Sequence, residues 1–296
     1  MESTVQGTCK LCKKQSKLKV SHFIPKFVGK WVKKTSVTGY IREGRSVHKR
    51  AQDIAKEHWL CGECEELFSG WERSFANKVF FPFVDKGECV AEYDSWMAKF
   101  CASVSWRTLG FISSKNDRST KPKEYNEALD KAEKCLSDFL QGKTSELYQY
   151  EQHVFPLERI ESTTEMGLPS NINRYFLRTM AMDIIGNSTD AFIYTKLPSF
   201  IILGFIRVKE PELMKSSKIE LGKGTIKPRE YWWPDGFINY IVEKCEAIAE
   251  AYDKIPEQHK ESFDDYIRNN TDKVSKSKSI EAFMYDYDQF GDDVFR

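Results

Sequence analysis

The sequence lacks a long apolar run and the features of a secretion signal. It contains no run of the roughly eighteen apolar residues that a membrane-spanning helix needs. Its most apolar stretch, Leu197 to Val208, is shorter than that and is interrupted by Pro198 and Gly204. The first residues, Met1 to Thr4, have neither the basic nor the apolar region of a signal peptide. We therefore expect a cytoplasmic protein without a membrane partner.

The second half of the chain also lacks several catalytic signatures. Residues 151–296 contain no glycine-rich phosphate loop, no serine nucleophile elbow and no cluster of histidines. The sequence shows no internal repeat. The role of this half therefore stays open between sensing, positioning of a substrate and formation of a homodimer.

Composition and patterning indicate an α+β fold. With 296 residues, 41% of them hydrophobic and 30% charged, the chain is long enough for two folded domains. The spacing of apolar residues predicts helices at 26–34, from Glu65 onward, and at 94–109, 123–140 and 237–253. Runs rich in Val, Ile, Phe, Tyr and Thr predict an antiparallel sheet from 151–160, 174–184, 191–196 and 200–208.

Four of the eight cysteines form two CxxC pairs, Cys9 with Cys12 and Cys61 with Cys64. This paired spacing is typical of a tetrahedral Zn²⁺ site, and the alternative is a set of buried or disulfide-bonded cysteines. His58 precedes the second pair, but four cysteines already complete the zinc shell. The remaining cysteines have no partner spacing and are expected in the core of a protein from a reducing compartment: Cys89, Cys101, Cys135 and Cys245.

Between the two pairs lies the block Ser21-His22-Phe23-Ile24-Pro25. The order CxxC, His with an apolar pair and Pro, then CxxC and a polar residue resembles the zinc-bearing HNH (ββα-metal) endonucleases. It is most similar to their variant in phage Holliday-junction-resolving endonucleases, and more loosely to uncharacterised bacterial proteins with the same order. The resemblance covers residues 8–75. It implies a structural zinc and a separate catalytic metal.

Carried over to this sequence, the resemblance makes His22 the general base. It makes Glu65, directly after the last cysteine, a ligand of a catalytic Mg²⁺ or Mn²⁺. The family's acid before the catalytic histidine is Ser21 here, and a hydroxyl is a poor Mg²⁺ ligand. Either another carboxylate replaces it, with Asp53 and Glu72 nearest in sequence, or the site has lost its catalytic metal.

The charge of the chain is unevenly distributed. Residues 1–50 hold thirteen Lys or Arg and two Glu, whereas the last sixteen residues hold five acids and one Arg. A basic N-terminal segment favours binding to nucleic acid, DNA more than RNA, and the alternative is a solvated basic face. The residues expected to contact nucleic acid lie on the helix at 26–34 and in the following loop or hairpin: Lys26, Lys30, Arg42, Arg45, Lys49 and Arg50.

These patterns predict three parts. A treble-clef or ββα zinc module is expected over 1–90, followed by a helix-and-sheet domain with C-terminal helices over 91–270. A flexible acidic and aromatic tail is expected over 271–296. The leading hypothesis is a metal-dependent HNH-type endonuclease. The alternatives are a zinc-stabilised nucleic-acid-binding protein without catalysis and a protein-interaction module whose zinc only supports folding.

Overall fold

The computed structural model describes the chain except residues 1–4, 44–45, 52, 162–166, 228 and 296. It confirms the predicted mixture of helices and antiparallel sheets with helices at the C-terminal end. The chain divides into two compact units, each made of three segments. Unit 1 contains residues 1–25, 55–156 and 180–232, and unit 2 contains residues 26–54, 157–179 and 233–296. The predicted boundaries at 90 and 270 assume contiguous parts, and the division of roles among those parts stays a prediction.

Unit 1 begins with a three-stranded antiparallel sheet in the order β1 (Val5–Thr8), β2 (Gln15–His22) and β5 (Lys56–Cys61). Helix α2 (Gly62–Phe75) follows β5 directly. The register pairs Leu18 with Val5 on one side and with Cys61 on the other. Strands β2 and β5 with α2 therefore have the strand–strand–helix order that the sequence predicted.

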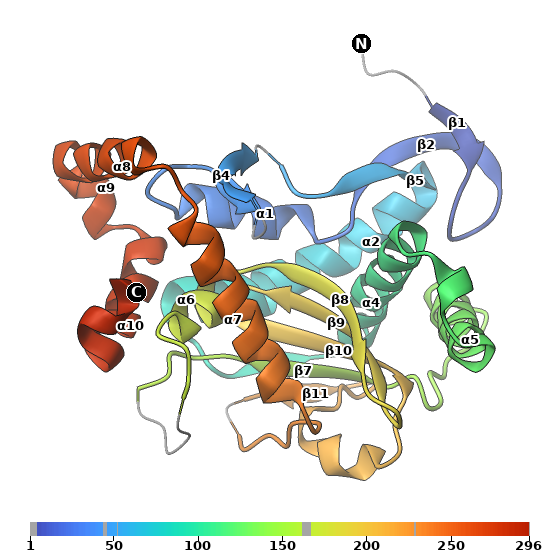
Figure 1. Ribbon diagram of the computed structural model, residues 1–296. Helices are drawn as coiled ribbons and strands as arrows, with labels where there is room; N and C mark the ends of the chain where they lie inside the picture. The colour runs from blue at the N-terminus through green and yellow to red at the C-terminus, as the bar shows by residue number, and fades with distance from the viewer. Residues whose placement is uncertain (1–4, 44–45, 52, 162–166, 228, 296) are drawn as a thin grey trace. The chain divides into compact units, whose positions relative to one another are not determined.

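The second sheet of unit 1 is antiparallel, in the order β7 (Gln152–Pro156), β10 (Phe200–Arg207), β9 (Ala191–Leu197) and β8 (Ala181–Gly186). Helix α4 (Trp96–Lys115) contacts all four strands, and α5 (Lys123–Leu140) packs against α4 (Figure 1). Thr108 and Thr195 share a 2.7 Å hydrogen bond across this interface. A Cβ at Gly204 would lie 2.7 Å from Ser105 Oγ, so glycine lets the helix approach the strand closely.

Shorter elements complete unit 1. Phe75 at the end of α2 stacks on Phe100 of α4, with ring centroids 4.0 Å apart. This contact joins α2 to the helix that packs on the four-stranded sheet. The remaining elements are the π-helical turn η1 (Ala76–Phe80), α3 (Phe81–Lys86), β6 (Ala91–Tyr93), η2 (Arg118–Thr120), η3 (Pro211–Ser217) and β11 (Gly224–Ile226). Strands β6 and β11 form a small antiparallel pair.

Unit 2 is mostly helical. It contains α1 (Lys26–Lys34), the hairpin of β3 (Ile41–Glu43) and β4 (Ser46–Ala51), α6 (Ile172–Arg178), α7 (Phe237–Asp253), α8 (Glu257–Asn269), α9 (Thr271–Ser275), α10 (Lys278–Phe290) and η4 (Gly291–Phe295). Arg178 donates to Thr35 Oγ1 (2.8 Å) and Val32 O (3.1 Å). These bonds satisfy acceptors at the C-terminal end of α1.

Two differences from the sequence predictions concern unit 2. The strand predicted over 174–184 is wrong in its first half, because Ile172–Arg178 is helix α6 and only Ala181–Gly186 is a strand. The stretch expected to be a flexible tail contains α9, α10 and η4. None of the described helices is both long enough and apolar enough to cross a bilayer.

Candidate metal centre and the His22 cluster

The four paired cysteines meet in unit 1. Their sulfur atoms all lie within 4.8 Å of one another, and the Sγ atoms of Cys12 and Cys61 are 3.8 Å apart. Ligands at the Zn–S bond length of about 2.3 Å and at tetrahedral angles lie about 3.8 Å apart. Within the described part of the chain, this is the only such group of His, Cys, Asp or Glu that could hold a metal ion. The predicted metal site is therefore compatible with the geometry.

Backbone structure brings the two pairs together. The first pair lies on the turn between β1 and β2, where Cys9 N donates to Lys14 O (2.9 Å) and Lys13 N donates to Cys9 O (3.0 Å). Lys10 N donates to Trp59 O (2.9 Å), which ties this turn to β5. Cys61 ends β5, and Cys64 lies in the first turn of α2. The two CxxC pairs are thus held by the sheet and by the start of the helix.

The thiols have unequal proton affinities. Burial raises the pKa of Cys9, but backbone N–H groups directed at its sulfur, first that of Cys61, outweigh burial and lower the pKa to about 7. Burial raises the pKa of both Cys12 and Cys64. Four thiolates this close would repel one another strongly. A divalent cation removes this repulsion, so the donor set fits Zn²⁺.

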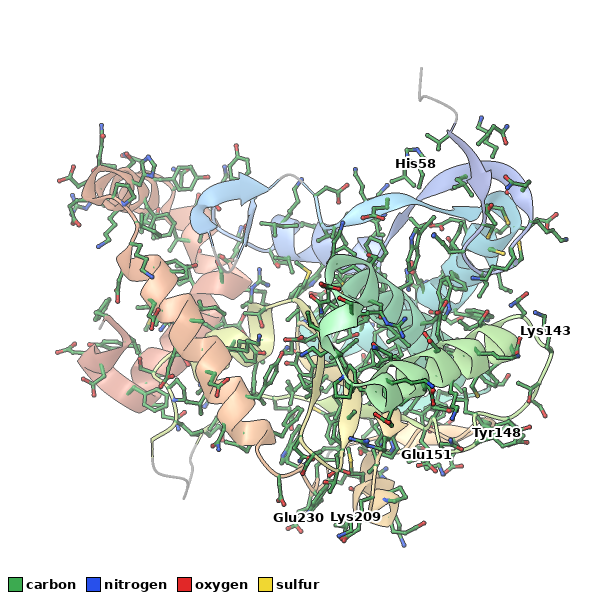
Figure 2. All side chains as sticks on the ribbon, turned by 45° about the vertical axis from the view of Figure 1, so that its right-hand side comes forward. His58, Lys143, Tyr148, Glu151, Lys209 and Glu230 are labelled. Atoms are coloured by element: carbon green, nitrogen blue, oxygen red, sulfur yellow. The ribbon has the colours of Figure 1, made fainter. Side chains whose placement is uncertain are left out.

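His58 was the other residue considered as a zinc ligand. It lies on β5, three residues before Cys61 (Figure 2). The group of four ligand atoms contains the cysteines and excludes His58.

A second group of side chains surrounds the end of β2. Ser21 Oγ donates to Glu65 Oε2 at 2.7 Å, so the position before His22 and the position after Cys64 are in contact. The register of β2 against β5 shifts just before these residues, where Trp59 of β5 is the extra residue between the pairs of Lys19 and Val20. Ser21 faces α2, because its hydroxyl bonds to Glu65 of that helix. Ser21 and His22 are both buried.

Arg107 of α4 is part of the same group, and the sequence predictions missed it. Its Nη1 donates to the backbone O of His22 (2.9 Å) and to Glu72 Oε1 (2.6 Å), and its Nε donates to Ser103 O (3.2 Å). The guanidinium lies 5.4 Å from the ring centroid of Phe68. The available signal was a lone arginine in an otherwise uncharged, buried stretch of the helix.

The electrostatics of the group centre on Glu65. Burial raises the pKa of its carboxyl, opposed by the Ser21 hydrogen bond and the Arg107 charge, while nearby Glu72 raises the pKa further. Two carboxylates, a guanidinium and an imidazole are therefore close enough to interact. Asp53, the other carboxylate considered from the sequence, belongs to unit 2, where its Oδ1 accepts from Ile54 N (2.9 Å).

The residues predicted to contact nucleic acid belong to unit 2. Lys26 and Lys30 are exposed on α1. The other four predicted contacts fall on residues or side chains outside the described part of the structure: Arg42, Arg45, Lys49 and Arg50.

Comparisons of this chain with protein-family models, curated proteins and solved structures found no match. The class that the fold and the site define is an α+β protein with a tetracysteine site suited to a structural metal such as zinc. Any finer function has to be argued from the residues themselves.

Proposed function

We propose that this chain is a metal-dependent endonuclease of the HNH type that cleaves phosphodiester bonds in DNA. The observation that carries the proposal is the 2.7 Å contact between Ser21 and Glu65 beside the four cysteines. In the family that the sequence resembles, the catalytic metal lies between the residues at these two positions. Here the end of β2 and the first turn of α2 bring them together, next to His22.

In the proposed reaction, His22 accepts a proton from water as the water oxygen attacks the phosphorus. The new P–O bond forms as the bond to the leaving sugar oxygen breaks, that oxygen takes a proton from solvent water, and His22 returns its proton to solvent. Mg²⁺ or Mn²⁺, when bound at Glu65 with Glu72 as the nearby second carboxylate, would stabilise the negative charge of the transition state. Arg107 holds both the His22 backbone and Glu72, and so fixes the base relative to α2.

A nuclease assay with Mg²⁺ or Mn²⁺ on DNA and RNA tests the proposal. His22→Ala and Glu65→Ala are expected to lose at least about a hundredfold in rate, the lower end of the contribution of a general base. His58→Ala is the matched control, because His58 lies on the adjacent strand and outside the metal group. Equal rates in wild type and His22→Ala, at equal zinc content, would show that His22 is not the base.

The second candidate function is nucleic-acid binding without cleavage. It is favoured because both carboxylates already have partners in the protein. Glu65 accepts a hydrogen bond from the Ser21 hydroxyl, and Glu72 forms an ion pair with Arg107. Binding without cleavage by the wild type would support this candidate. Ser21→Asp would then supply the carboxylate of the family pattern, and metal-dependent cleavage gained by that variant would identify Ser21 as the cause of inactivity.

A further inference from the structure

Five lysines lie on the first CxxC turn and the strand after it, and all five are exposed. We call them the knuckle lysines: Lys10, Lys13, Lys14, Lys17 and Lys19. Residues 5–22 contain no Asp or Glu. Among the described residues, no acid lies within ion-pair distance of any of these five ammonium groups. None of the five ammonium groups is therefore held in a direct ion pair with a described acid.

The backbone that presents these lysines is well defined. The turn is closed by the hydrogen bonds between Cys9 and both Lys13 and Lys14, and Lys13 adopts a left-handed φ of 62°. On β2, Lys17 and Lys19 alternate with the buried Leu18 and so share the solvent-facing side of the sheet. At the rise of an extended strand, these two Cα atoms are about 7 Å apart. The charges are thus carried on a sheet and on the turn that holds Cys9 and Cys12.

We propose that the knuckle lysines form the surface that binds the phosphate backbone of DNA, an inference that rests on the proposed function and names its contact surface. Lys19 precedes His22 by three residues on the same strand, about 10 Å along an extended chain. A backbone bound along Lys17 and Lys19 would therefore follow the strand that carries the proposed base. Lys26 and Lys30, predicted from the sequence, belong instead to unit 2.

The main competing role of these lysines is to balance the zinc site. Four thiolates and one Zn²⁺ carry a formal charge of −2, because each thiolate contributes one negative charge. Two nearby lysines would neutralise this charge, so three of the five exceed what the metal site itself needs. The excess favours a polyanionic partner, and counterion release predicts binding that weakens steeply with salt.

The test compares two fivefold Lys→Gln variants with the same net charge. The knuckle variant changes Lys10, Lys13, Lys14, Lys17 and Lys19. The control variant changes five exposed lysines elsewhere in unit 1: Lys121, Lys131, Lys209, Lys223 and Lys227. Binding of a fluorescent DNA duplex is measured by anisotropy between 50 and 200 mM salt, with zinc content determined for each protein.

The knuckle variant is expected to bind at least about tenfold more weakly. Its slope of log K against log salt should be smaller by about 0.9 for each lost phosphate contact, and the control should resemble wild type. If both variants bound DNA equally weakly, the proposed contact surface would be wrong, but the proposed nucleic-acid function would not be affected. Loss of zinc from the knuckle variant would overturn it in favour of the charge-balancing role. No binding by wild type at low salt would reject both the surface and the nucleic-acid function.

Discussion

At the scale of single residues, His153 shows how burial controls protonation. Its ring is buried on β7, with Nδ1 3.0 Å from Ser217 Oγ and Nε2 3.5 Å from Glu151 Oε2. Burial lowers the pKa of His153 and outweighs the opposing effect of Glu151. Burial raises the pKa of Glu151, labelled in Figure 2, but the nearby His153 imidazole and the hydrogen bond from Lys218 Nζ (2.6 Å) reverse this and lower the pKa overall.

These two shifts predict acid-sensitive stability. A histidine whose folded pKa is depressed binds its proton more readily in the unfolded state, so protonation favours unfolding below about pH 6.5. A carboxyl with a lowered folded pKa loses its stabilising effect as the pH falls through that value. Both effects reduce the free energy of unfolding on acidification. His153→Gln should make the loss between pH 7 and pH 5 smaller, measured by urea denaturation, and an unchanged loss would contradict the assignment.

Arg107 predicts a different kind of effect. Arg107→Met removes the partner of the half-buried Glu72 carboxylate and the donor to the His22 carbonyl, which should cost about 3 kcal/mol of stability. Arg107→Met with Glu72→Gln should recover part of that loss, because the second change removes the unpaired charge. Denaturation of the two single variants and the double variant measures the coupling. Simple additivity would mean that the ion pair does not stabilise unit 1.

At the scale of elements, α10 holds the start of α6 through one carboxylate. Asp286 is fully buried, and it accepts from Asn173 N (2.7 Å), Arg174 N (3.1 Å) and Arg174 Nε (2.8 Å). The first N–H groups of a helix have no partner within the helix. Asp286 therefore caps α6 from a position more than a hundred residues away in sequence.

Asp286→Ala should destabilise unit 2 by about 2–4 kcal/mol, because it leaves two backbone donors without their acceptor and removes the ion-pair partner of a partly buried guanidinium. Hydrogen exchange should increase in α6 and α10, while β9 and β10 of unit 1 serve as the internal reference. Asp288→Ala is the matched control, since Asp288 is an exposed acid on the same helix. Equal exchange in both variants would contradict the capping role.

The elements also show where sequence patterns are sufficient. Helices α1, α5 and α7 have the predicted bounds, because apolar spacing and nearby breakers such as Pro122, Gly142 and Pro234 are local signals. Helix α6 was missed because its cap comes from α10. The cysteine site was predictable from spacing alone, whereas Arg107 reaches His22 across 85 positions that no local pattern records.

At the scale of the whole molecule, the chain alternates between its two units. Residues 26–54 leave unit 1 after Pro25, contribute to unit 2 and return to unit 1 before Cys61. The predicted contiguous domains could not anticipate this, because sequence composition carries no record of which distant segments pack together. One consequence is that both halves of the cysteine site lie in unit 1 although a segment of unit 2 separates them in sequence.

The grouping of the four cysteines predicts that the loss of two of them prevents metal binding. Cys61→Ser with Cys64→Ser should abolish stoichiometric zinc, measured by elemental analysis, because two of the four ligands are lost. Cys89→Ser is the control, since Cys89 lies outside the group. Zinc content unchanged in the double variant would contradict the site.

Loss of the metal should also destabilise the helix and strands that the cysteines connect. Without the metal, the first turn of α2 and the turn between β1 and β2 would lose the coordination bonds that join them, so hydrogen exchange should rise in β2, β5 and α2. Helices α7 and α10 of unit 2 contain none of the ligands and should keep their exchange rates. If exchange rose equally in both units, the metal would stabilise the whole chain. If exchange changed in neither unit, the tetracysteine site would not support folding, because a structural site contributes its binding energy to the elements that hold it.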